Sequence, residues 1–269
     1  MKEVTIKGKK IGFLALSYPE YSWVVQDNRE KEGLGCAYIN DLCVNHVIIE
    51  AKKTLDYLFI LPHYGIEYMD IPMPEVIARY RDFIDYGADG VFGAHPHCPQ
   101  GREEYNGKPI FYSLGNFFFN SKKDTLYRAT NRKHWYEGRG VILTINGEGL
   151  RWEVVNMKNI DNVALEIDHS EASRQHNALV CEYLRDCQKY DSILQPYLDS
   201  RVKKDILGLY EAFRPQTVKS ALRILVQNIF RGRNRQPGSK GNLYNTLKYD
   251  LIRGRILRFL SDENNWNKY

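Results

Sequence analysis

The chain has 269 residues, a formal net charge of +5, and 43% apolar, 13% aromatic and 26% charged residues. These values are typical of a folded globular protein and exclude a disordered chain. No apolar run approaches the roughly 18 residues that a membrane-spanning helix needs, and the length fits one large core or, as we expect, two smaller ones.

The cysteines and the N-terminal residues indicate in which cellular compartment the protein works. The five cysteines are odd in number and form no Cys-x-x-Cys pair, which argues against a disulfide framework or a zinc ribbon. The first residues show only a short apolar stretch before tyrosine and proline, so we expect no signal peptide. The sequence therefore predicts a reducing compartment, either the cytoplasm or the periphery of a membrane.

The first predicted elements are a hairpin, a helix and a strand. Residues 4–18 read as two strands around a turn in the Gly-Lys-Lys stretch, and the second strand is apolar enough to be internal. Asn40 or Asp41 can cap a helix that runs to about Lys53. Residues 56–62, DYLFILP, follow as a buried strand that ends at His63.

Strands and helices continue to alternate. A helix is expected from Pro74 to Gly87, since proline suits a first helical turn and glycine a helix end. Short strands follow over residues 89–95 and 108–119, and residues 139–158 form two strands around an Asn-Gly-Glu-Gly turn. This alternation predicts an α/β sandwich, a class in which the ends of the strands carry the chemistry.

After Ile167 the periodicity becomes helical. Four segments show it: residues 171–190, 191–213, 217–230 and 243–260. We therefore expect two domains, an α/β domain over residues 1–165 and an all-helical basic region over residues 170–269.

The helical region carries most of the positive charge. Residues 201–258 contain fourteen Lys and Arg against three Asp and Glu. One interpretation is a face that binds an anionic polymer such as polyglutamate or an acidic polysaccharide, or a membrane surface. The simpler interpretation, which we prefer, is an amphipathic bundle with its charges in water. Nucleic acid is the weakest option, because no reader motif accompanies the charge.

Three histidines stand at the ends of predicted strands. His63 follows one strand, with Glu67 four residues later, and the His-x-His pair of His95 and His97 follows the next. In extended backbone such a pair projects both rings to one side, and neutral imidazole binds divalent first-row metals well. Together these residues indicate a metal site, although solvated loop histidines are the alternative.

Three stretches resemble consecutive motifs of one bacterial family: KGKKIGFLALSY, LPHYGIEY and DYGADGVFGAHPHCPQGREEYNGKPIFYSLGNFFF. That family is the CapA-like capsule-synthesis family, PGA_cap, named for poly-γ-glutamate. It is similar to the calcineurin-like metallophosphoesterases, in which a four-layer α/β/β/α sandwich holds two metal ions. The resemblance implies this fold and a divalent metal ion such as Mn, Zn or Fe, with two ions in an intact domain.

The resemblance also implies roles for individual residues. His63, His95 and His97 correspond to metal-binding histidines. Glu67 matches the glutamate of the family's His-x-Gly-x-Glu-Tyr motif, where it would orient a ligand or transfer a proton. Asn116 would support the site through its side-chain amide, or would simply form a turn.

The sequence departs from the metallophosphoesterase pattern at its start. The expected Gly-Asp and Asn-Leu-Glu elements, which supply carboxylate and amide ligands, do not stand in it. Asp41, Asp56 or Asp89 could replace them, but Asp56 and Asp89 stand at strand starts, the wrong end for the site. We therefore expect an N-terminally incomplete or degenerate domain.

Two functions follow. The first is a capsule or exopolymer biosynthesis protein with a metal-dependent, phosphoesterase-like hydrolase site. The alternative is a noncatalytic subunit that binds polyanions or acts as a scaffold. In either case the expected partners are an anionic polymer or polysaccharide, other capsule-synthesis proteins or a membrane surface.

The remaining candidates have simpler interpretations. Cys98 could be a metal ligand, but we prefer the interpretation that it is a partly buried structural cysteine. His134, beside Trp135, could contact an anionic substrate, but a loop position is preferred. His46, His169 and His176 are expected to be structural or solvated.

Overall fold

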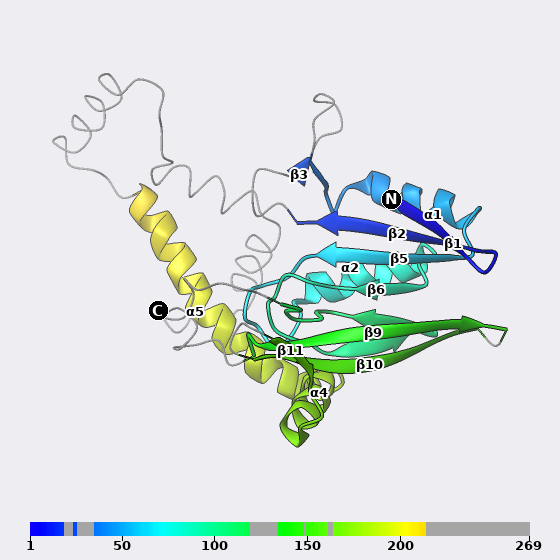
Figure 1. The fold of residues 1–269 in the computed structure, drawn as a ribbon. Helices are drawn as coiled ribbons and strands as arrows, with labels where there is room; N and C mark the ends of the chain where they lie inside the picture. Colours follow the sequence, from blue (N-terminus) through cyan, green and yellow to red (C-terminus); the bar gives the residue numbers. More distant parts are fainter. Residues whose placement is uncertain (19–23, 26–34, 119–133, 148, 161–163, 214–269) are drawn as a thin grey trace. The chain divides into compact units, whose positions relative to one another are not determined.

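The structure, a computed structural model, describes residues 1–18, 24–25, 35–118, 134–147, 149–160 and 164–213 (Figure 1). The chain divides into two units, Met1–Asp191 and Ser192–Tyr269. Every candidate site residue lies in the first unit.

A mixed six-stranded sheet forms the centre of this unit. Its strand order is β1-β2-β5-β6-β8-β7, with the inner pairs parallel and the two edge strands antiparallel to their neighbours. The strands are β1 (Lys2–Ile6), β2 (Lys9–Ser17), β5 (Tyr57–His63), β6 (Gly90–Phe92), β8 (Lys108–Phe111) and β7 (Arg102–Tyr105). Parallel strands end at the same edge, which brings the ends of β5 and β6 together.

The N-terminal hairpin forms as predicted, with its turn one residue earlier. Lys7 and Gly8 have φ values of 49° and 79°, and two positive φ angles in a two-residue loop define a type I′ turn. Two short parallel strands, β3 (Val24–Val25) and β4 (Cys36–Ala37), follow.

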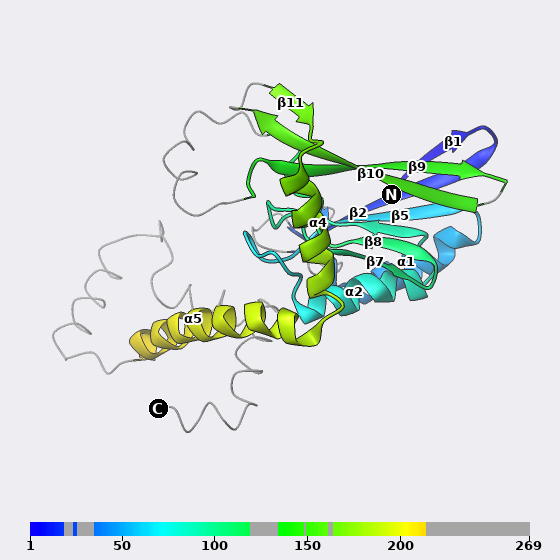
Figure 2. The ribbon, with the colours of Figure 1, turned by 90° about the horizontal axis from the view of Figure 1, so that it is seen from below.

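Two helices cover one face of the six-stranded sheet (Figure 2). Helix α1 (Leu42–Lys52) begins where Asp41 accepts a hydrogen bond from the Cys43 amide, so the predicted cap is confirmed. Helix α2 (Pro74–Asp85) begins at the predicted proline. It buries four apolar side chains, Val76, Tyr80, Phe83 and Ile84.

A second sheet covers the other face (Figure 2). Its order is β11-β10-β9, from β11 (Ala164–Ile167), β10 (Gly149–Ile160) and β9 (Glu137–Asn146). Phe111 of the first sheet meets Trp152 of the second edge to face, with ring centroids 5.5 Å apart, and Val141 and Leu143 pack against the same cluster. The described layers are therefore helices, a six-stranded sheet and a three-stranded sheet.

Part of the predicted helical region is helical. Helices α4 (Glu171–Tyr183) and α5 (Cys187–Phe213) correspond to the first two segments. The other two segments, residues 217–230 and 243–260, lie outside the described residues, as does much of the basic stretch. No helix in the described part of the chain is long and apolar enough to cross a membrane.

Two predicted strands were wrong in extent, and four strands were not predicted. The segment predicted as a strand over 108–119 pairs in the sheet only as β8, because Gly115, at φ 72°, turns the chain toward Gly138 of β9. The strand predicted over 89–95 ends at Phe92. The strands that were not predicted are β3, β4, β7 and β11.

Candidate functional site

The loops that follow β5 and β6 are joined by backbone hydrogen bonds. The Tyr64 amide donates to the Ala94 carbonyl at 3.0 Å, and the Tyr68 amide donates to the Pro96 carbonyl at 2.8 Å. Gly65 lies between them with φ +143°, and a Cβ there would be 2.9 Å from the Pro96 ring. The glycine therefore permits the close approach that brings the two histidine-bearing loops together.

The backbone of the His-x-His pair is not extended as predicted. His95 and His97 have φ values of 106° and 58°, in a region that residues with a Cβ seldom occupy. Each such residue costs on the order of 1–3 kcal/mol and persists only where its surroundings impose it. The prediction that extended backbone directs both rings to one side was therefore wrong. The positions of the two rings depend instead on the positive φ angles of His95 and His97.

Of the three predicted histidines, His63 and His95 are in contact, and the His97 ring lies farther off, beside that of His95. His95 Nδ1 is 3.1 Å from His63 Nε2, and the centroids of the His95 and His97 rings are 6.1 Å apart. His95 is buried, His63 is exposed and His97 is half-buried. Two nitrogens bound to one ion at about 2.0–2.1 Å would stand about 2.9 to 3.4 Å apart. The 3.1 Å separation therefore fits a shared ion as well as a direct hydrogen bond.

Asn116 holds the ring of His97. Its Nδ2 donates to the Trp135 carbonyl at 2.9 Å and to the His97 carbonyl at 3.3 Å, which directs Oδ1 to His97 Nδ1 at 2.8 Å. An amide oxygen only accepts, so Nδ1 carries the proton and the lone pair of the neutral ring lies on Nε2. This is the geometry of a residue that orients a metal-binding histidine.

Glu67 lies near the same ring without touching it. Its carboxylate oxygen is 4.0 Å from His97 Nε2, and its side chain is 42% exposed. This separation is too long for a hydrogen bond but can be bridged by one water molecule.

Cys98 has the surroundings of a structural thiol. Its Sγ donates to the Met69 carbonyl at 3.3 Å, and burial raises the pKa of the thiol far above its ordinary value. Because metals bind the thiolate, this position does not favour a ligand role.

The three aspartates considered as replacement ligands are engaged elsewhere. Asp89, at the start of β6, is buried between Lys52 at 2.7 Å and Lys108 at 2.5 Å. Asp56 accepts hydrogen bonds from the Lys9–Lys10 segment, and Asp41 caps α1. Asp56 and Asp89 therefore lie at the strand starts, as the sequence indicated.

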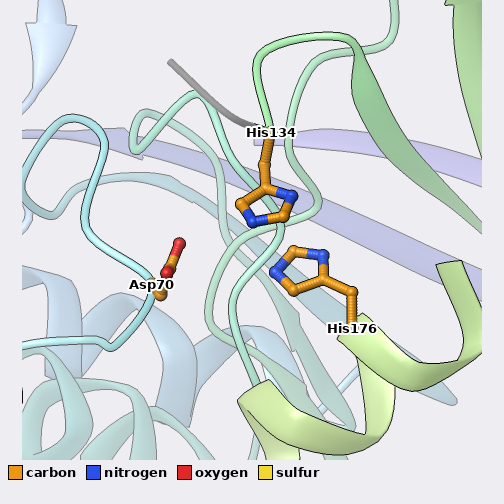
Figure 3. Close-up of side chains that lie close together, drawn as sticks. All are labelled: Asp70, His134 and His176. Carbon is orange, nitrogen blue, oxygen red and sulfur yellow. The ribbon is translucent and has the colours of Figure 1, made fainter. Parts of the chain in front are cut away.

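A second cluster contains His176, which was expected to be structural or solvated, and His134, which was expected to be a loop residue or a contact for an anionic substrate. Asp70 follows β5, His134 precedes β9 and His176 lies on α4, and one potential ligand atom from each lies within 4.8 Å of the others (Figure 3). Within the part of the chain that the structure describes, this is the one group of three such side chains at these distances. The two imidazoles stack, with centroids 3.6 Å apart and planes 10° from parallel.

Glu137 joins the two stacked rings. Its two carboxylate oxygens lie 2.8 Å from His134 Nδ1 and 2.8 Å from His176 Nδ1. Burial alone would raise the pKa of Glu137, but these two contacts outweigh it and lower the pKa to about 2. The carboxylate is therefore charged, and it holds each of the two rings at its Nδ1 atom. No sequence pattern indicated this cluster, because its members come from distant segments without a shared motif.

Comparison with known proteins concerns the first cluster. Residues 1–121 match the family described as "Bacterial capsule synthesis protein PGA_cap". These residues contain His63, Glu67, His95, His97 and Asn116, whereas His134, Glu137 and His176 lie beyond them.

Individual relatives match shorter stretches. The chain is 45% identical over 73 residues to the "PGA biosynthesis protein CapA" of Bacillus subtilis (strain 168), which is 27% of this chain and 19% of the relative. It is 41% identical over 68 residues to the "Capsule biosynthesis protein CapA" of Bacillus anthracis, or 25% and 16% of the two chains. An "Uncharacterized protein y4sH" of Sinorhizobium fredii is 55% identical over 42 residues, or 16% and 9%. The chain thus matches less than a fifth of the length of these relatives.

Proposed function

We propose, on the premise that residues 1–121 belong to the bacterial capsule synthesis family PGA_cap, that this chain serves capsule or exopolymer biosynthesis of the poly-γ-glutamate type through a metal-dependent, phosphoesterase-like hydrolase site. His63, His95 and His97 are its metal ligands, and Glu67 and Asn116 complete it.

One observation carries the proposal. Imidazoles from two separate strand ends stand 3.1 Å apart, between His95 Nδ1 and His63 Nε2, in the part of the chain that matches the family. The strained backbone at His95 and His97 supports it, because left-handed conformations of this kind cluster at functional sites.

Each residue has a part in the proposed chemistry. A bound divalent ion, or a pair of ions, would act as a Lewis acid and lower the pKa of a bound water. Asn116 keeps the proton of His97 on Nδ1 and so leaves Nε2 as the donor atom. Glu67, 4.0 Å from that atom, is placed to orient a water molecule or exchange a proton with it.

The fold assigned with this function is the metallophosphoesterase-like α/β/β/α sandwich. The helix layer and the two sheets supply three of its four layers (Figure 2). We propose the domain limits 1–165 for this sandwich and 170–269 for the basic region.

A noncatalytic, polyanion-binding subunit is the second candidate, and a specific observation favours it. Among the described residues, no carboxylate joins His63, His95 and His97 in a cluster as close as that of Asp70, His134 and His176. Without a bridging carboxylate, an activated water is poorly held. In this candidate the site is degenerate and the basic region binds the polymer.

The proposed partners are the same for both candidates. They are an anionic polymer or polysaccharide, other capsule-synthesis proteins and a membrane surface, and the proposed location is the cytoplasm or the membrane periphery. The charge of residues 201–258 supports an anionic partner.

Metal analysis and a hydrolysis assay together test the proposal. We expect the purified chain, incubated with Mn²⁺, to hydrolyse bis-p-nitrophenyl phosphate, and expect His63→Ala and His95→Ala to abolish both hydrolysis and one equivalent of bound metal. His169→Ala, at an exposed histidine, is the matched control. Metal binding without hydrolysis supports the second candidate, and no change in either variant contradicts the site.

A further inference from the structure

We propose that Asp70, His134 and His176 form a second, separate binding site for a divalent transition-metal ion of the Zn²⁺ type, oriented by Glu137. Two of the three ligands lie beyond the residues that match the PGA_cap family. The inference does not depend on the proposed function.

The first argument is the orientation of the rings. Glu137 faces Nδ1 of both His134 and His176, so in the neutral rings Nδ1 carries the proton and the lone pair lies on Nε2. Both Nε2 atoms lie on the side of the rings that faces Asp70 (Figure 3). A carboxylate that holds the far nitrogen of a metal-binding histidine is the usual support for such a ligand.

The second argument is an unpaired buried atom. His176 Nε2 is buried and has no hydrogen-bond partner among the described residues, and the His176 side chain is only 9% exposed. A buried imidazole nitrogen without a partner destabilises the fold, because it has lost its hydrogen bonds to water. A metal ion beside Asp70 would pair this atom and remove that cost.

The ligand set selects the class of ion. Two imidazoles and one carboxylate suit Zn²⁺, Fe²⁺, Mn²⁺ or Co²⁺, whereas Ca²⁺ and Mg²⁺ prefer sets made of oxygens. Three protein ligands also leave at least one position for water.

Some movement must accompany binding. Neighbouring ligands of one ion at about 2.0–2.2 Å stand about 2.8 to 3.6 Å apart, less than the 4.8 Å that bounds this cluster. The rings are nearly parallel, so each must also tilt to direct its lone pair at a common point. Each Nδ1 faces its own oxygen of Glu137. The rings can therefore tilt so that their Nε2 lone pairs converge, while each Nδ1 keeps its contact with Glu137.

An ion at this position would have a structural consequence. It would join helix α4, the segment before β9 and the loop after β5, three parts of the first unit that no disulfide links. We therefore expect the site to stabilise the attachment of α4.

The experiment uses the full chain with the three histidines of the first site replaced, His63→Ala, His95→Ala and His97→Ala. Calorimetric titration with Zn²⁺ and the visible spectrum with Co²⁺ are measured. We expect one remaining equivalent of metal, whose affinity falls about 100-fold or more on adding either Asp70→Asn or His176→Ala, since even outer residues typically contribute 10–100-fold. His169→Ala is the matched control and leaves the affinity unchanged.

The outcomes separate this site from the first one. A folded triple variant that binds no Zn²⁺, or that binds it equally well with Asp70→Asn, overturns the proposal and leaves the proposed function unaffected. If the triple variant does not fold, Asp70→Asn is made in the otherwise unchanged chain. Asparagine keeps the shape of the half-buried Asp70, and the zinc stoichiometry must then fall by one.

Discussion

The two histidine clusters of this protein are built in opposite ways. His63, His95 and His97 are positioned by backbone: two loops joined by amide–carbonyl bonds, with two residues at positive φ. His134 and His176 are positioned by a side chain, because one carboxylate, Glu137, faces both rings. The first cluster therefore depends on local chain geometry, and the second depends on packing between distant segments.

This difference decides how each cluster should respond to mutation. A backbone-built cluster is sensitive to any residue that prevents the loops from approaching each other. A cluster oriented by one side chain is sensitive to the charge and shape of that side chain.

The largest effect is expected at Gly93, just before His95. A Cβ at this position would lie 2.2 Å from the Tyr112 carbonyl oxygen and 2.9 Å from the Tyr80 ring, so Gly93→Ala must displace backbone. We expect a loss of about 3 kcal/mol or more in the free energy of unfolding, together with loss of metal at the first cluster. Urea denaturation and metal analysis measure the two effects.

Gly147→Ala is the control for this change. A Cβ at Gly147 has no heavy atom within 4 Å, and we expect a stability change within about 0.5 kcal/mol. Equal stability of the two variants would contradict the argument that the packing of Tyr112 and Tyr80 leaves no room for a side chain at Gly93.

The next effect concerns Glu137 and the second cluster. Glu137→Gln keeps the side-chain shape but leaves only one oxygen to accept from two imidazoles. We expect the affinity of the second site for Zn²⁺ to fall about 10- to 100-fold, with the first site unchanged. Calorimetry in the triple-alanine background gives the value, and an unchanged affinity would show that Glu137 does not orient the rings.

The sequence predicted the first cluster because its members follow strands. The run DYLFILP predicts β5, and parallel strands bring His63 near His95 at one sheet edge. What periodicity could not predict was the backbone at His95 and His97, since positive φ at residues with a Cβ is imposed by tertiary contacts.

The second cluster could not be predicted for a different reason. His176 lies on α4 and His134 precedes β9, and nothing in either segment indicates the other. Their meeting depends on how α4 lies against the sheets, a matter of packing that a one-dimensional pattern does not contain. Strand β7 was missed because its residues, REEY, are charged and lack the alternation of a half-buried strand.

A smaller, pH-dependent effect is expected at the ion pair between Arg81 of α2 and Glu103 of β7. The guanidinium donates to both carboxylate oxygens, at 2.8 and 2.6 Å, and the Tyr112 hydroxyl donates at 2.6 Å. Burial raises the pKa of Glu103, but these donors outweigh it and hold the pKa below its ordinary 4.5. The stabilisation is therefore present above pH 4.5 and is lost as the pH falls through the lower folded value.

Glu103→Gln tests this sign. We expect it to lower the free energy of unfolding by about 1–2 kcal/mol at pH 7, and expect the difference from the unchanged chain to shrink toward pH 3. Urea denaturation at both pH values measures it, with Glu104→Gln, at an exposed neighbour, as the control. A difference that is equal at both pH values would assign the effect to packing.

The smallest effect is expected at Asp41. It tests whether the first cluster uses the Asp41 carboxylate as a metal ligand. Its side chain accepts from the Cys43 amide at 2.8 Å as the cap of α1. We expect Asp41→Ala to cost about 1 kcal/mol of stability and to leave the metal content unchanged. Asp41→Asn, which retains the cap, should restore the stability. Loss of metal in both variants would instead make Asp41 a ligand, and the first cluster would then depend on a side chain from outside its two loops.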